Sequence, residues 1–155
     1  MDADLTPDDR LAAFWAVAQR YAHVGDLEVV MGSPWSGALP PPAWTYGAGE
    51  AAAADLEGIL SGHRTATTTP LTEFDGQLPH RGDLTILTDA DGTPRALIRL
   101  SDVRQVAFGE ITEEQARADG EPDLAAWRRT RRDLWPDADD TTPVVWERFT
   151  VLYQE

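Results

Sequence analysis

Gly62-His63-Arg64-Thr65-Ala66-Thr67-Thr68-Thr69-Pro70 is the most informative stretch of this 155-residue chain. It places hydroxyls and two side chains that can carry positive charge directly after an Ala-rich, helix-prone segment. In a strand, residues 64 and 67 would face opposite sides, whereas in a turn or irregular loop they converge. A convergent Arg64 and Thr67 could hold a carboxylate, a phosphate or a polarised carbonyl. The alternative is a Thr run that enters a strand, with Arg64 exposed. We expect the loop from Gly62 to Thr69 to form one wall of a ligand cleft.

Helical patterns precede this loop. Thr6 is a typical N-cap for a first helix over about residues 6–22, and a second helix is predicted over about 49–60, with Gly62 just past its end. Between them, about residues 24–49 form a Pro/Gly loop with aromatic side chains. Aromatic residues in such a loop either pin it to the body or line a site for a flat ligand. Both readings stay open for Trp44 and Tyr46, while Trp35 is expected to pin the loop.

Strand and helix patterns follow the loop. Apolar residues predict strands over about 83–88, 95–108 and 144–153, the second broken near Asp102. Asp89 to Gly92 is a typical hairpin turn. Thr112 to Gln115 reads as a capping box that opens a short helix, and Pro122 is expected to start another that runs to about Leu134. Helices, strands, helices and a last strand, in that order, favour an α+β fold in a single domain, residues 1–155.

Composition narrows the classes of partner. Thirteen basic residues against 27 acidic ones give a net charge of −14, which opposes binding of duplex DNA at long range. A nucleoside or a short single strand of RNA remains compatible with this charge. The absence of cysteine excludes thiol nucleophiles and Cys-based metal sites. The three His have no metal-ligand spacing, so we expect no metal and no cofactor. No membrane span is expected, and a cytoplasmic location is the default.

Several motifs in register resemble the ASCH domain family. The family's loop reads Gly-x-Lys-Thr-x-Thr after a helix, and Gly62, Thr65 and Thr67 match it, with Arg64 where Lys is usual. Trp44 to Gly47 resembles a Trp-x-Phe-Gly of one bacterial branch. Further matches follow in the same order, at residues 79–83, 89–92, 108–120 and 143–149. The resemblance covers about Trp44 to Tyr153. It implies a small PUA-like β-barrel flanked by helices, with the cleft beside the Gly62 loop.

The resemblance also implies candidate functions. ASCH domains are proposed as RNA-binding modules, and one bacterial branch consists of amidohydrolases that remove the acetyl group of N4-acetylcytidine with a Thr nucleophile, a Lys and a Glu. Carried over by motif, these three positions are Thr67, Arg64 and Asp119. The candidate catalytic residues are therefore Thr67, Arg64 and Asp119. The candidate ligand contacts are Thr65, Trp44, Tyr46, His63 and Arg148.

Two of these three positions differ from the family's residues, and both differences bear on catalysis. A Lys of lowered pKa can take a proton from a Thr hydroxyl, but Arg cannot, since its pKa stays above about 12. Asp119 reaches one methylene less far than Glu. His63 and His80 are alternative bases, or exposed loop residues. Glu147 and Arg148 on the last strand could reach the cleft or form a structural pair.

The sequence thus predicts a site for a nucleoside, a modified base or a short RNA beside the Gly62–Thr69 loop, with or without hydrolysis of an amide. A non-catalytic RNA-binding module is the alternative, in which Arg128, Arg129, Arg131 and Arg132 contact phosphates beside Trp127 and Trp135. A third possibility is ribonuclease activity, with His63 and His80 as acid and base.

Overall fold

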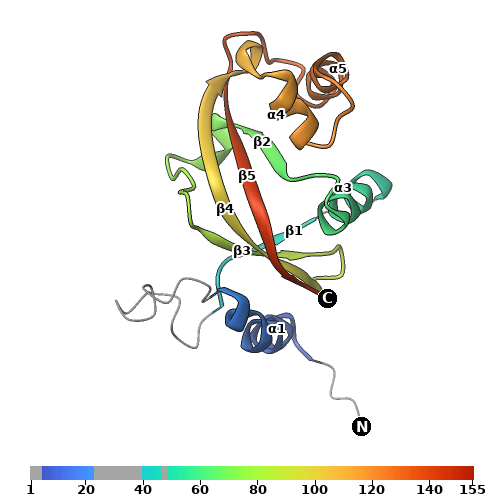
Figure 1. Cartoon of the computed structure of the whole chain (residues 1–155), viewed down its shortest axis with the longest axis vertical. Helices are drawn as coiled ribbons and strands as arrows, with labels where there is room; N and C mark the ends of the chain where they lie inside the picture. Colours follow the sequence, from blue (N-terminus) through green and yellow to red (C-terminus); the bar gives the residue numbers. More distant parts are fainter. Residues whose placement is uncertain (1–4, 23–39, 47–48) are drawn as a thin grey trace. The chain divides into compact units, whose positions relative to one another are not determined.

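The computed structural model describes residues 5–22, 40–46 and 49–155, which form a mixed α+β fold (Figure 1). This confirms the predicted α+β class. Much of the aromatic Pro/Gly loop, Trp35 included, lies outside the described residues. In chain order, the elements are α1 (Pro7–Ala22), β1 (Ala43–Thr45), α3 (Glu50–Ser61), β2 (Ala66–Pro70), η1 (Leu71–Phe74), β3 (Leu84–Thr88), β4 (Pro94–Ala107), η2 (Phe108–Glu110), α4 (Glu113–Ala118), α5 (Leu124–Leu134) and β5 (Pro143–Gln154).

The strands are hydrogen-bonded in the order β1-β3-β4-β5-β2. The short strand β1 runs parallel to β3, with Trp44 opposite Leu87. The hairpin of β3 and β4 is antiparallel, and so is the pairing of β2 with β5. At the turn of the hairpin, Asp89 accepts hydrogen bonds from the amides of Asp91 and Thr93, both at 3.0 Å. The predicted hairpin is therefore confirmed.

The chain divides into two compact units, each built from several segments. Unit 1 comprises residues 1–56, 84–99 and 151–155, and unit 2 comprises residues 57–83 and 100–150. The longest strands, β4 and β5, contribute residues to both units.

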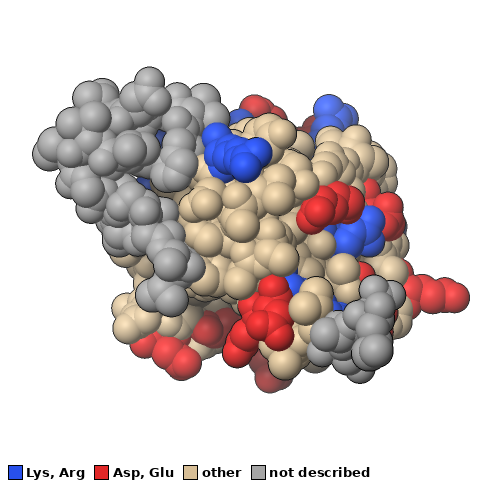
Figure 2. Space-filling model, turned by 90° about the horizontal axis from the view of Figure 1, so that it is seen from below, with Lys and Arg blue, Asp and Glu red and all other residues tan. Residues whose placement is uncertain are grey.

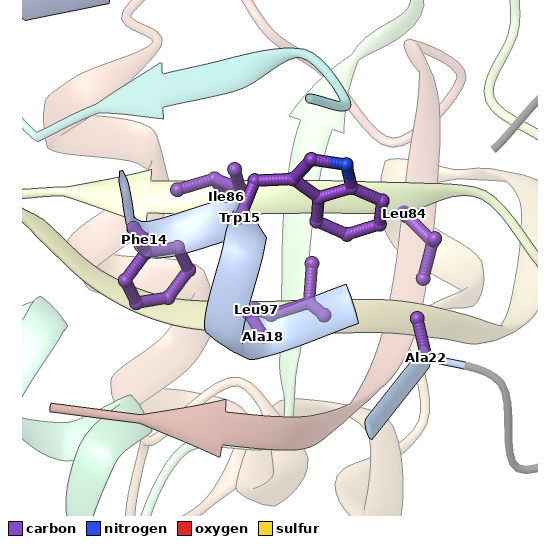
Figure 3. Close-up of a cluster of buried hydrophobic side chains, with 7 residues drawn as sticks. All are labelled: Phe14, Trp15, Ala18, Ala22, Leu84, Ile86 and Leu97. Atoms are coloured by element: carbon purple, nitrogen blue, oxygen red, sulfur yellow. The ribbon is translucent and has the colours of Figure 1, made fainter. Parts of the chain in front are cut away.

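The core of unit 1 packs one face of α1 against strands (Figure 3). Thr6 caps the helix, since its Oγ1 accepts from the amide of Asp9 at 3.1 Å and its own amide donates to the Asp9 carboxylate at 3.1 Å. The helix therefore begins where the sequence predicts it. Its buried side chains meet apolar residues of β3 and β4, and the cluster contains Phe14, Trp15, Ala18, Ala22, Leu84, Ile86 and Leu97.

The core of unit 2 forms around Trp127 of α5, which is fully buried. Its indole ring lies 5.1 Å from the ring of Phe108, centroid to centroid. The other buried members come from β2, α4, β5 and the segment that joins η2 to α4: Ala66, Ile111, Ala116, Val144 and Trp146. The predicted capping box of α4 is confirmed, because Thr112 and Gln115 bond each other's backbone. Unit 2 contains the Gly62–Thr69 segment.

Three sequence expectations differ from the structure. Helix α5 begins at Leu124, because the side chain of Asp123 accepts from the amide of Ala126 at 2.8 Å and makes Asp123 the N-cap, with Pro122 outside the helix. Strand β4 runs through Asp102 without a break. The second half of the Gly62–Thr69 segment is not a loop: Ala66–Pro70 form strand β2, as the strand alternative for the threonine run predicts, since β-branched threonines pair well with the apolar strand β5. Arg64, which that alternative leaves exposed, has a side-chain exposure of 13%.

Within the described ranges, no helix combines the length and the apolar character needed to cross a bilayer.

Candidate functional site

Strand β2 divides the threonine run between two faces of the sheet. In the antiparallel register, Thr67 lies opposite Glu147, and Thr68 lies opposite Trp146. Successive strand residues point to opposite faces, and directly opposed residues share a face. Thr68 is buried at 7% exposure, whereas Thr67 is half-buried. The two hydroxyls therefore lie in different environments.

On the Thr68 face, a buried carboxylate gathers four donors. Asp119 Oδ1 accepts from Arg64 Nη2 at 2.8 Å. Asp119 Oδ2 accepts from Thr68 Oγ1 at 2.9 Å and from Trp127 Nε1 at 2.8 Å, and it lies 2.9 Å from Arg131 Nη2. We call these five residues the Asp119 cluster. It joins β2, α5, the exit of α4 and the loop before β2 into one polar core.

The backbone around Asp119 explains how Arg64 reaches it. Helix α4 ends at Ala118, and Gly120 adopts a φ of +88°, a left-handed conformation that glycine takes without strain. A Cβ at Gly120 would lie 3.5 Å from Arg64 Cγ, so the stem of Arg64 lies across this glycine. The amide of Thr65 also donates to the carbonyl of Ala118 at 2.8 Å. The loop before β2 is thus fixed against the exit of α4.

The contacts of Asp119 determine what the cluster can do chemically. Its side chain has 0% exposure, and each carboxylate oxygen forms an ion pair with a guanidinium group. Arg131 also donates to Glu121 at 3.3 Å, and Arg64 Nε donates to the carbonyl of Ala66 at 3.2 Å. A carboxylate without exposed surface, held by four donors, is not accessible to a ligand. The geometry suits Asp119 and Arg131 to a structural role, and it leaves only an edge of Arg64, whose side chain is 13% exposed, for other contacts.

On the other face, Thr67 and Glu147 form a pair of cross-strand neighbours. The Cβ atoms of such pairs lie about 4.5–5.5 Å apart. Burial raises the pKa of the Glu147 carboxyl to about 7, with a further contribution from the negative charge of Asp83. Within the described part of the chain, the Glu147 carboxyl has no hydrogen-bond or ion-pair partner. We call these two residues the Thr67–Glu147 pair; it holds a hydroxyl beside a carboxyl that can carry or release a proton near neutral pH.

The remaining predicted site residues lie at separate places. Arg148 shares the buried face of Trp146, stacks over its indole at 5.1 Å and pairs with Glu114 at 3.6 Å. His63 is exposed and contacts the carbonyl of Gly120 at 3.2 Å. Thr65 is exposed, and its backbone groups bond those of Ala118 and Phe149.

Two of the predicted ligand contacts belong to unit 1. Trp44 lies on β1 with 59% exposure, and Tyr46 follows that strand, its amide bonded to the carbonyl of Thr88 at 3.0 Å. Their role in ligand binding stays a prediction. In unit 2, His80 is exposed and lies 3.9 Å from the Asp83 carboxylate.

The arginines of α5 are divided between the core and the surface. Arg131 is buried in the Asp119 cluster. Arg128 donates to the carbonyl of Gly109 at 3.1 Å, and Arg132 pairs with Asp140 at 3.2 Å. An open groove of about 770 Å³ runs along this helix, lined by Leu124, Ala125, Arg128, Arg129, Arg132 and Asp133.

Sequence reasoning missed the contacts of Thr68 and Arg131 with Asp119, and it left open whether Glu147 reaches the cleft. Thr68, and not Thr67, is the hydroxyl that contacts Asp119. Arg131 shares an apolar stripe with Leu124 and Trp127, and a cation on such a stripe signals a buried ion pair. Glu147 follows Val145 by two residues and so shares the face of a buried side chain. That alternation could have indicated a carboxyl drawn out of water.

Metal-binding groupings of three or more His, Asp or Glu are absent from the residues that the structure describes.

Comparison with known proteins places the chain in a family of domains. The family described as the ASCH domain matches residues 42–153. The crystal structure of an ASCH domain from Lactobacillus crispatus JV V101 superposes with a TM-score of 0.71 at 20% sequence identity, covering 92% of this chain and 94% of the other. A protein from Enterococcus faecalis V583 superposes with a TM-score of 0.64 at 22% identity, covering 92% and 87% of the two chains. No curated protein matches the sequence.

Proposed function

The chain belongs to the ASCH domain family, whose fold is PUA-like, and from this premise we propose that it binds a nucleoside or an unpaired nucleobase at the Thr67–Glu147 pair. The observation that carries the proposal is a half-buried hydroxyl opposite a half-buried carboxyl on paired strands, within the family's characteristic loop and closing strand. Buried polar groups are normally hydrogen-bonded, so a carboxyl in this position is suited to a ligand.

The chemistry of the pair fits the edge of a base. Nucleobases that are taken out of a stack are read by hydrogen bonds to their Watson–Crick edge, where donors and acceptors lie side by side. A threonine hydroxyl both donates and accepts, and a carboxyl with a pKa of about 7 donates when protonated and accepts when ionised. Cytosine, which presents an acceptor beside an amino group, matches a protonated Glu147.

The charge of the protein favours a small ligand over a long polyanion. The formal net charge is −14, so a neutral nucleoside approaches without the repulsion that a phosphate chain meets. Figure 2 shows one face of the molecule, on which blue basic side chains are separate from one another and no continuous basic track is seen among the described atoms.

Direct titration tests the proposal. Cytidine and N4-acetylcytidine are added to the wild type, to Thr67→Val and to Glu147→Leu, and binding is followed by calorimetry. We expect each substitution to weaken binding by about tenfold, the loss of one good hydrogen bond to a ligand. The matched control is Thr72→Val, since Thr72 is an exposed residue of η1. Equal affinities in all four proteins would contradict the proposed site.

A second candidate, binding of short RNA without catalysis, rests on the groove along α5. Arg128, Arg129 and Arg132 line it together with apolar atoms of Leu124 and Ala125. A single strand held there would bind through its phosphates, and its affinity would fall steeply with salt. Titration of a short RNA at two salt concentrations, with Arg129→Ala as the variant, tests this candidate. An RNA affinity that does not change with salt concentration would contradict this candidate.

A third candidate is hydrolysis of an amide on the bound base, such as that of N4-acetylcytidine. The Thr67–Glu147 pair favours it, because a hydroxyl lies on the same sheet face as a carboxyl of raised pKa. Mass-resolved chromatography of cytidine released from N4-acetylcytidine, with Thr67→Ala as the control, measures this activity. Release that persists in Thr67→Ala would remove Thr67 from the mechanism.

A further inference from the structure

We propose that the groove along α5 is a docking surface for a short acidic segment of another protein, in which an apolar side chain accompanies the carboxylates. The groove is lined by Leu124, Ala125, Arg128, Arg129, Arg132 and Asp133, and we call it the α5 groove. The inference goes beyond the proposed nucleobase site on β2 and β5 and does not depend on it.

The α5 groove lies on the side of the helix that is turned away from the core of unit 2. The buried residues of α5 are Ala126, Trp127 and Arg131. At 3.6 residues per turn, the lining residues of the groove fall within the opposite half of the helix surface. A helix rises about 1.5 Å per residue, so the groove is about 14 Å long from Leu124 to Asp133. This length accommodates about four residues of an extended peptide, or between two and three turns of a helix.

The α5 groove concentrates positive charge on a protein that is otherwise acidic. The chain has 13 basic residues, all of them arginines, against 27 acidic ones, and four of the 13 lie between residues 128 and 132. Three of these four, Arg128, Arg129 and Arg132, line the groove. Like charges one turn apart repel each other on a helix, so a cluster of this kind is unfavourable until anions meet it. The charge of the groove therefore complements an acidic partner.

The guanidinium groups of the groove are incompletely paired. Arg129 is exposed and has neither a hydrogen-bond nor an ion-pair partner among the described residues. Arg128 donates from Nη2 to the carbonyl of Gly109 at 3.1 Å, whereas its Nε is buried without a partner. Arg132 pairs with Asp140 at 3.2 Å, but both side chains are more than half exposed, and exposed pairs of this kind contribute little. Since guanidinium forks bind carboxylates through two parallel hydrogen bonds, the groove can accept acidic side chains.

The apolar part of the lining favours a peptide over single-stranded RNA. Proteins that bind single strands combine cations with aromatic rings on which bases stack. The six described residues that line the groove include no aromatic ring. Trp127 is fully buried, and the half-buried Trp135 packs edge-on against Phe108. Leu124 and Ala125 instead offer an apolar surface at one end of the groove, which suits an aliphatic side chain.

Binding of designed peptides tests the inference directly. The probes are a set of fluorescent peptides of about ten residues, which contain glutamates and leucines in different orders. Two companion sets carry glutamine for every glutamate, or serine for every leucine. We expect members of the acidic set to bind the wild type in an anisotropy titration, and each companion peptide to bind about tenfold or more weakly.

Two double variants locate the binding. Arg129→Gln with Arg132→Gln removes two guanidinium groups of the groove. Arg104→Gln with Arg117→Gln is the matched control, because it removes two exposed arginines elsewhere in unit 2 and changes the net charge equally. We expect the first variant to weaken peptide binding by about tenfold or more, and the control to bind as the wild type does. Thermal unfolding checks that both variants are folded.

Several outcomes would overturn the inference. It is wrong if none of the acidic peptides binds, if either companion set keeps the full affinity, or if the two double variants bind equally. It is also wrong if a strand of uridines binds the α5 groove more tightly than every peptide, since the occupant is then RNA. Self-association of the wild type in sedimentation that Arg129→Gln with Arg132→Gln abolishes would instead identify a second copy of this chain as the occupant.

The same variant separates this inference from the proposed function. Arg129→Gln with Arg132→Gln leaves Thr67 and Glu147 unchanged, so its affinity for nucleosides should equal that of the wild type. A protein that binds acidic peptides but no nucleoside would contradict the proposed function and leave the α5 groove as a docking surface. The converse result would contradict the docking surface alone.

Discussion

At the scale of single residues, two carboxyl groups of unit 2 have opposite fates. Asp119 is buried with a full set of cationic and neutral donors, and Glu147 is half-buried beside another acid, Asp83. Burial of a charge is tolerated only when it is paired, and otherwise the group holds a proton. The first arrangement fixes structure, and the second leaves a group whose charge can change.

The Asp119 cluster predicts a large effect of one substitution. In Asp119→Asn, the guanidinium groups of Arg64 and Arg131 lose their shared carboxylate while they remain largely out of water. Removal of one partner of a buried ion pair typically costs about 3–5 kcal/mol. Urea unfolding should show a loss of this size.

Asp133→Asn is the matched control for this substitution, since Asp133 is exposed on α5. It should stay within about 0.5 kcal/mol of the wild type. An Asp119→Asn protein of wild-type stability would mean that the two arginines find water or other partners.

The raised pKa of Glu147 predicts how stability depends on pH. In the unfolded chain the carboxyl ionises near its ordinary pKa of 4.5, and in the folded protein its pKa is about 7. Stability from this group is therefore fully present below pH 4.5 and is lost as the pH rises to about 7 and above. One pKa unit is worth about 1.4 kcal/mol.

Comparison with Glu147→Gln isolates this contribution. The variant should exceed the wild type in stability by about 2–3 kcal/mol at about pH 8, and by much less at about pH 4.5. Urea unfolding at the two pH values measures the difference. If the difference in stability between Glu147→Gln and the wild type does not change with pH, Glu147 ionises as readily in the folded protein as in the unfolded chain.

At the scale of elements, the exit of α4 organises the site. The helix is only six residues long, so its own hydrogen bonds give it little stability. Its capping box at the start and Gly120 just past its end define where it begins and stops. The carbonyl of Ala118, at the end of this helix, accepts a hydrogen bond from the amide of Thr65.

Removal of the N-cap of α4 should therefore also affect residues outside the helix. Thr112→Ala deletes the hydroxyl that accepts from the amide of Gln115 at 3.1 Å. Loss of an N-cap of this kind costs about 1 kcal/mol. We expect that loss in urea unfolding, together with faster amide exchange at Thr65, whose partner Ala118 lies at the other end of the helix. Unchanged exchange at Thr65 would mean that β2 and the Asp119 cluster hold this loop without the cap.

Sequence patterns predicted most of these elements because their signals are local. The capping box, the Asp89 turn and the apolar periods of α1 and β5 each act within a few residues. The site was less predictable. Thr67 and Thr68 are both plausible from the motif, and only the β2–β5 register decides which face each one takes. Arg64 and Arg131 meet at one carboxylate although they lie far apart in the sequence, and no local signal reports such a contact.

At the scale of the whole molecule, charge is the dominant property. Acidic residues outnumber basic ones by 27 to 13, and several of the basic ones are bound in ion pairs such as those of Arg64, Arg131 and Arg132. Excess charge of one sign opposes compactness through self-repulsion. Salt screens this repulsion, with a Debye length that falls from about 30 Å at 0.01 M to about 8 Å at 0.15 M.

The protein should therefore become more stable when salt is added. We expect the urea midpoint to rise between about 0.01 M and about 0.15 M NaCl, because buried ion pairs are screened less than exposed charges. A variant with Glu73, Asp133 and Asp137 changed to amides, all exposed positions, should show a smaller rise. A midpoint that falls with salt would indicate that favourable surface pairs outweigh the net repulsion.

The segments of the two units alternate along the sequence, and this has a practical consequence. The chain crosses between them at four places, after residues 56, 83, 99 and 150. No single cut in the gene separates one unit from the other, because any fragment that contains all of one unit also contains residues of the other. A stop codon anywhere before β5 removes sequence from both.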